Sequence, residues 1–205
     1  EYGRKLEEAK DDPAKRPARD FGREALLSVV RRELPLKIHC HRADDILTAI
    51  RVAKEFNIRF TLDHCTEGYL IPEHLKRAIA EQGAGIIVGP LLSERSKIEL
   101  KNLSFAAPKA LYDNGIEFAM MTDHPVIPEQ YLPVCAALAV REGLPEEEAL
   151  RSITINAARI AGIDDRVGSL EPGKDADVAV FNGHPLDFRA RCVLTLVNGK
   201  IAHEE

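Results

Sequence analysis

The sequence predicts an α/β fold, in which a parallel sheet alternates with helices and is followed by a small module of antiparallel strands. Between residues 36 and 121, short apolar runs alternate with stretches of helical periodicity. Parallel neighbours need a crossover connection, and a helix is the usual one. After residue 167, β-branched runs are separated by Pro-Gly and Asn-Gly pairs, which are typical of turns between antiparallel strands.

The composition argues against some functional classes of protein. The chain has 205 residues, of which 45% are hydrophobic and 30% charged, and its formal net charge is −5. An acidic chain without a basic run lacks the clustered positive charge of a nucleic-acid surface. No apolar stretch approaches the roughly 20 residues of a membrane span, and no signal-peptide pattern opens the chain. We therefore expect a cytoplasmic protein with neither nucleic-acid nor membrane partners.

The first elements follow from local patterns. Residues 1–20 are charged, contain proline and lack apolar periodicity, so we expect a loop or a cut end. Residues 21–34 carry apolar side chains at helical spacing and are followed by Pro35, which disfavours further helix. A strand is predicted at 36–40, and a helix at 43–56 has one apolar face.

The next units repeat this order. Residues 71–83 predict a helix, because Pro72 suits a first helical position and Gly83 suits the position past the end. The other elements of this stretch are strands at 59–63, 85–89 and 116–121 and a helix at 104–115.

Three more helices precede the segment of short β-branched runs after residue 167. Two are predicted at 128–143 and 145–154, and Asn156 is expected to cap a third helix. We place a domain boundary near residue 163, so that residues 21–163 form the α/β part and residues 164–205 the small β module.

Polar residues that can bind metal lie where three predicted strands end. These are His39, His64 and Asp123, about one and two strand-helix units apart. In a parallel barrel, equivalent positions converge on one rim, and imidazole and carboxylate suit zinc and related divalent ions. A single histidine at a strand end is more often structural, and Asp123 could instead cap the turn before Pro125. Three such residues in phase favour the metal site.

Other residues are candidates for substrate contact. His41 faces the same side as His39, because strand side chains alternate. Either histidine could be the ligand, and His41 could otherwise contact substrate or solvent. His124 and Tyr69 lie in loops where a substrate pocket is expected, although both could simply be solvated.

Four segments together resemble a known family. They are LKIHCHRADDI, TLDHC, MTDHP and the tail NAARIAGIDDRVGSLEPGKDADVAVFNG, and they are similar to the amidohydrolase superfamily, specifically its imidazolonepropionase-like and prolidase-like metal-dependent hydrolases. The resemblance covers about residues 20 to 203. It implies a (β/α)₈ TIM-type barrel that holds one or two divalent ions, with zinc expected, and is flanked by a small β-sandwich.

The resemblance also assigns roles to particular residues. It implies that His39 is the ligand from the fifth barrel strand, His64 the ligand from the sixth, and Asp123 the aspartate of the eighth. In such enzymes the aspartate takes a proton from the attacking water and passes it to the leaving nitrogen. The implied substrate is a small molecule with an amide, cyclic amide or dipeptide-like bond.

The chain departs from the family pattern in one large respect. The His-x-His pair of the first strand and the lysine or glutamate of the fourth are missing, so the four strands match strands five to eight. A barrel needs about 250 residues, and we expect the C-terminal half of one, inactive by itself. Half a barrel would expose two strand edges and an apolar sheet face, so we expect a homo-oligomer or association with the missing N-terminal half.

Two alternatives remain open. One is an open α/β sheet whose edges are covered by the charged N-terminal segment. The other is a non-catalytic truncated homologue that serves as an oligomerisation or binding module. A barrel that binds phosphate at its rim is disfavoured, because no Gly-rich phosphate loop follows the last strand.

Overall fold

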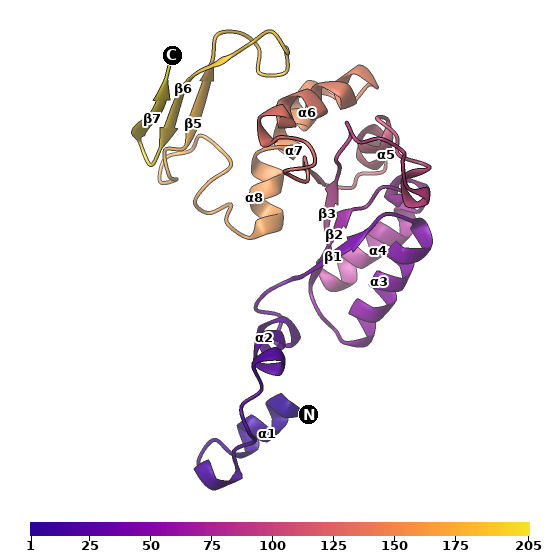
Figure 1. The fold of residues 1–205 in the computed structure, drawn as a ribbon, viewed down its shortest axis with the longest axis vertical. Coiled ribbons are helices and arrows are strands. Elements are labelled where there is room, and N and C mark those ends of the chain that lie inside the picture. The colour runs from indigo at the N-terminus through magenta and orange to yellow at the C-terminus, as the bar shows by residue number, and fades with distance from the viewer.

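A four-stranded parallel sheet forms the centre of the molecule. The structure is a computed structural model that describes residues 1–205. The strands lie side by side in chain order, from β1 to β4 (Figure 1). They are β1 (Leu36–Cys40), β2 (Phe60–His64), β3 (Gly85–Val88) and β4 (Ala119–Met120). The α/β fold with a parallel sheet is therefore confirmed, although β4 is much shorter than the predicted strand.

Helices follow the strands: those after β1 and β2 lie together on one side of the sheet, and those after β4 pack at the β4 end (Figure 1). The α-helices of this part are α3 (Ala43–Glu55), α4 (Pro72–Gln82), α5 (Ala107–Asp113), α6 (Leu132–Arg141), α7 (Glu146–Ser152) and α8 (Ile155–Ala161). Short 3-10 helices lie at η2 (Gly68–Leu70), η3 (Ile98–Leu100) and η4 (Glu129–Tyr131). No helix of the structure has the length and apolar character that crossing a membrane would require.

The hydrophobic core lies between the sheet and these helices. Phe60 and Leu62 of β2 and Ile86 of β3 are fully buried against Ile46 and Leu75, from α3 and α4. These are the alternate strand positions and the apolar helix stripes on which the sequence prediction depended.

The opposite face of β1 is open and polar. Lys37 and His39 are exposed, whereas Ile38 and Cys40 point into the core. The Lys37 ammonium lies 3.1 Å from the carboxylate of Asp63 on β2. The prediction of an apolar open face is therefore wrong for this strand, because the pleat sends its polar residues outward.

The N-terminal segment is helical rather than a loop. It forms α1 (Tyr2–Glu8), η1 (Pro13–Lys15) and α2 (Phe21–Val30). Tyr2, Leu6 and Ala9 form a short apolar stripe at helical spacing, which the charged residues obscured.

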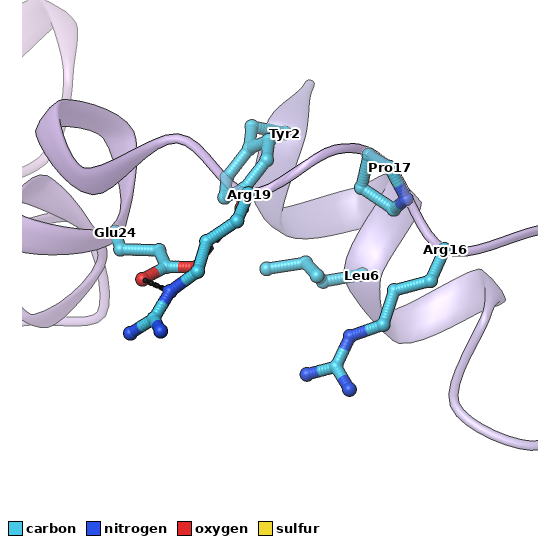
Figure 2. Close-up of a pocket in the computed structure, with 6 residues that line it drawn as sticks. All are labelled: Tyr2, Leu6, Arg16, Pro17, Arg19 and Glu24. Carbon is cyan, nitrogen blue, oxygen red and sulfur yellow. Dashed lines mark hydrogen bonds and ion pairs between the residues drawn. The ribbon is translucent and has the colours of Figure 1, made fainter. Parts of the chain in front are cut away.

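The ring of Tyr2 is buried, and its hydroxyl donates a hydrogen bond to Glu24 of α2 at 3.2 Å. Figure 2 shows Tyr2, Glu24 and the arginine side chains around the hollow between the two helices. The two helices project away from the sheet (Figure 1), which argues against the alternative in which this segment covers the sheet edges.

A three-stranded antiparallel sheet ends the chain, in the order β5 (Val178–Phe181), β6 (Cys192–Val197) and β7 (Lys200–Glu204). Asn198 and Gly199 connect β6 to β7 with φ values of 50° and 71°. Positive φ at both turn residues is what a tight hairpin requires, and Asn-Gly supplies it at low cost. The antiparallel strands agree with the turn signals of the sequence.

Asn156 joins α8 to the edge of the sheet. It lies inside α8, which begins at Ile155 with Thr154 as its N-cap residue. Its side-chain amide is buried and donates to the backbone oxygen of Phe118 at 3.2 Å. The predicted capping role is therefore wrong, because a long-range partner holds this side chain.

Candidate metal centre

Three histidines gather at the carboxyl ends of β1 and β2. The parallel register pairs His39 with Asp63 and Cys40 with His64, so the two strands end side by side. One nitrogen from each of His39, His41 and His64 lies within 4.8 Å of the others. The ring of His64 is centred 4.3 Å from each of the other two rings. We call these three residues the histidine cluster.

The backbone at the end of β2 places His64 in this cluster. Strict alternation would send His64 toward the core side, as Cys40 opposite it is sent. Instead, His64 and Cys65 have φ values of 75° and 43°. Left-handed conformations in non-glycine residues cost of the order of 1–3 kcal/mol and often occur at functional sites.

A hydrogen bond fixes the tautomer of His64. Its Nδ1 lies 2.8 Å from the backbone oxygen of Gly89, which follows β3. Because a carbonyl oxygen only accepts, Nδ1 carries the proton and Nε2 has a free lone pair. Burial lowers the pKa of His64, and this keeps the ring neutral at neutral pH. Metal-binding histidines are commonly held in this way.

His41 is held from two sides. Its Nδ1 lies 2.8 Å from the hydroxyl of Thr66, and its backbone oxygen accepts from Glu67 at 2.8 Å. Burial, together with the neighbouring histidines, lowers the pKa of His41 to about 4. When Nδ1 donates to Thr66, the Nε2 of His41 has a free lone pair.

The donor set suits a divalent ion. His39 is exposed at the open edge, whereas His41 and His64 are buried, so the cluster is accessible from one side. Neutral imidazole nitrogen is a ligand for zinc and for related transition metals. The residues therefore fit a metal such as zinc.

The comparison with protein families agrees with this geometry. A family model described as Amidohydrolase family matches residues 15–203. The chain belongs to the amidohydrolase family. The histidine cluster lies within the matched residues, at the ends of two neighbouring parallel strands.

Individual relatives match this chain to different extents. Amidohydrolase tasK of Hapsidospora irregularis is 28% identical over 182 residues, which are 88% of this chain and 18% of that protein. Imidazolonepropionase of Geobacillus thermodenitrificans is 37% identical over 125 residues, which are 56% of this chain and 28% of that protein. The chain thus spans less than a third of these curated relatives.

Two solved structures share the fold. An amidohydrolase from Thermotoga maritima is 41% identical with a TM-score of 0.92, over 100% of this chain and 52% of that one. An adenosine deaminase from Xanthomonas campestris with bound zinc is 20% identical with a TM-score of 0.62, over 99% of this chain and 55% of that one. The second likeness shows the fold alone.

The other predicted site residues lie outside the cluster. Asp123 follows β4 with a φ of 53°, and its charge acts to raise the pKa of His64. His124 is exposed. The hydroxyl of Tyr69 donates to the backbone oxygen of Asn102 at 3.0 Å, and its ring packs against the core. Tyr69 therefore joins two loops, and its hydroxyl is already engaged.

Three further residues touch the cluster without having been predicted. They are Thr66, Gly89 and Glu99. The Gly-Pro pair after a buried strand was a turn signal that pointed toward Gly89. Thr66 and Glu99 carry no local signal, because their roles arise from contacts between different loops.

Proposed function

We propose that this chain carries part of the active site of a metal-dependent amidohydrolase that hydrolyses a carbon–nitrogen bond of a small molecule. The histidine cluster is the observation that carries the proposal. Its nitrogens converge, and the proton of His64 is directed away from the shared space by Gly89. Amides, cyclic amides and dipeptide-like compounds are the substrate classes that we propose.

Zinc is the metal that we propose, because the donor set is built from imidazole nitrogens. A divalent ion bound there would polarise a substrate carbonyl and lower the pKa of a bound water. The contribution of the chain is to hold the rings of His41 and His64 neutral and fixed, so that little rearrangement is needed on binding. His39 would complete the set from the open edge.

Asp123 is the residue that we propose for proton transfer. It follows β4 at the same end of the sheet as the cluster, and its negative charge acts to raise the pKa of His64. Its carboxylate would accept a proton from the attacking water and return it to the leaving nitrogen. Such proton transfer typically contributes 10²–10⁴-fold to a rate. The exposed His124 beside it would contact the substrate.

We further propose that β1 to β4 correspond to the second half of a (β/α)₈ barrel and that β5 to β7 belong to a small β-sandwich. The likeness to the Thermotoga maritima amidohydrolase supports this, because the whole of this chain aligns with about half of that one. Residues from the other half would complete the site, and we expect little catalysis from this chain alone.

Metal binding by the chain tests the centre directly. The metal-free protein is titrated with Zn²⁺ by calorimetry, and we expect binding that His64→Ala abolishes or weakens strongly. Exposed His74→Ala is the matched control. Unchanged binding in His64→Ala would contradict the proposal.

The reading frame upstream of Glu1 is then examined for a strand that ends in His-x-His, and its full product is screened with acyl-dipeptides, lactams and imidazolones.

The alternative of a binding or oligomerisation module has one observation in its favour. Strand β1 lies at the edge of the parallel sheet, with β2 as its only neighbour, and such an edge invites pairing. Under either function we propose self-association or association with the missing half. A monomer at micromolar concentration in size-exclusion chromatography with light scattering would argue against self-association.

A further inference from the structure

A carboxylate from a separate loop faces the histidine cluster. We propose that Glu99 is a further residue of this metal site, where its carboxylate binds the divalent cation held by the histidine cluster. Glu99 belongs to η3 in the segment between β3 and α5. The inference rests on the proposed metal centre and adds to it a residue that the sequence pattern did not indicate.

The geometry already brings the carboxylate close to a ligand nitrogen. Oε1 of Glu99 lies 3.9 Å from Nε2 of His41. Two donors that each lie about 2.0–2.2 Å from one tetrahedral ion are about 3.3–3.6 Å apart, so the present separation exceeds that range by only a few tenths of an ångström. One cation could therefore contact both atoms after small side-chain adjustments. The Glu99 side chain is 34% exposed, so it is partly shielded from water.

The segment that carries Glu99 is fastened in place. The side-chain amide of Asn102 donates to Glu67 at 2.8 Å, and the backbone oxygen of Asn102 accepts from Tyr69 at 3.0 Å. The other carboxylate oxygen of Glu67 accepts from the backbone nitrogen of Ala43 at 2.8 Å. The start of α3, the segment after β2 and the segment that carries Glu99 are thereby joined by contacts that do not involve Glu99 itself.

Glu67 also fixes the histidine that Glu99 faces. Its backbone nitrogen donates to the backbone oxygen of His41 at 2.8 Å. One residue therefore holds both His41 and, through Asn102, the segment of Glu99.

A lysine competes for the same oxygen. The ammonium of Lys97 lies 3.5 Å from Oε1 of Glu99, and a surface ion pair is the plain structural explanation of Glu99. The two explanations predict different effects of substitutions on metal binding. If Glu99 binds the cation, removal of Lys97 frees the carboxylate and removes a repulsive charge, so metal affinity increases. If Glu99 only pairs with Lys97, its charge still changes metal affinity from a distance, but the Co²⁺ spectrum of Glu99→Gln stays that of the wild type because the ligand set is unchanged.

The test is a titration of the metal-free chain with Co²⁺, followed by calorimetry and by visible absorption of the bound ion. Glu99→Gln keeps the shape of the side chain and removes its charge, and we expect affinity to fall about tenfold or more, with an altered spectrum. Lys97→Met is expected to increase affinity. The matched control is Glu94→Gln, an exposed glutamate of the same loop, which is expected to leave both readouts unchanged.

The outcomes separate this inference from the proposed function. A wild-type Co²⁺ spectrum in Glu99→Gln, whatever its affinity, would overturn the role of Glu99 and leave the histidine centre intact. Absence of Co²⁺ binding by the wild-type chain would overturn both. Circular dichroism of each metal-free variant checks the fold. If Glu99→Gln is unfolded, Glu99→Asp decides, because it keeps the charge and shortens the reach of the carboxylate, and a wild-type Co²⁺ spectrum there also overturns the inference.

Discussion

Replacement of Gly89 by alanine should disturb both the fold and the histidine cluster. Gly89 follows β3 with a φ of 138°, a conformation that residues with a side chain rarely adopt. A Cβ atom at this position would lie 2.2 Å from the backbone oxygen of Met121, far inside contact distance. The backbone oxygen of Gly89 is also the acceptor for Nδ1 of His64. Alanine must therefore push the segment after β4 away or move this acceptor.

The size of the effect follows from two contributions. The unfavourable φ costs about 1–3 kcal/mol, and forcing an additional carbon into a packed backbone contact costs about 1–3 kcal/mol more. We expect a loss of about 2–6 kcal/mol in the free energy of unfolding, against a total of about 5–15 kcal/mol for an ordinary domain. In the fraction that stays folded, loss of the support for His64 should weaken metal binding by about 10- to 100-fold.

Gly83→Ala is the matched control. Gly83 ends α4 with a φ of 69°, and a Cβ atom there would meet nothing within 4 Å. This variant has the backbone cost without the collision, so we expect a loss of only about 1–2 kcal/mol.

Urea unfolding followed by circular dichroism measures both losses, and Zn²⁺ calorimetry measures the affinity. Equal unfolding midpoints for the two variants would refute the steric argument. Wild-type zinc affinity in folded Gly89→Ala would refute the argument about His64.

Three other predictions follow from single residues. Asp123→Asn should lower the hydrolysis rate of the complete enzyme by about 10²–10⁴-fold while metal content measured by elemental analysis stays the same, and unchanged turnover would exclude proton transfer by Asp123. Because burial lowers the pKa of His41 to about 4, the unfolded chain takes up a proton near pH 6.5 before the folded chain does. Stability should therefore fall by about 3 kcal/mol as the pH decreases from 6.5 to 4, and His41→Gln should reduce this slope in urea unfolding at several pH values. Asn156→Ala removes the hydrogen bond to Phe118 and should cost about 1–3 kcal/mol in thermal or urea unfolding; a neutral effect would show that this bond does not hold α8 to the sheet.

Local patterns were sufficient for most of the elements. The strand at 36–40 and the helices at α3 and α4 lie where the apolar periodicity placed them. The incorrect predictions of secondary structure also have local causes. In α1, an apolar stripe of three residues was hidden among charges that pair along the helix, such as Arg4 with Glu8. In β4, few residues pair with β3, although the apolar run is longer.

The sequence by itself determined that metal-competent residues stand at the ends of neighbouring strands. A period of two and a period of 3.6 are properties of local backbone geometry, so the chain order alone brings His39 and His64 to the same end of the sheet. Chain order also sufficed to predict that His39 and His41 share one side.

Only the tertiary structure decided how these residues are used. The left-handed backbone of His64 turns its ring into the cluster, and Gly89 selects its tautomer. Glu99 reaches His41 through loops that three other residues fasten, and the hydroxyl of Tyr69 is engaged by Asn102. Such contacts join positions far apart in the chain, and their side-chain directions depend on the packing of the whole fold, which no local periodicity encodes.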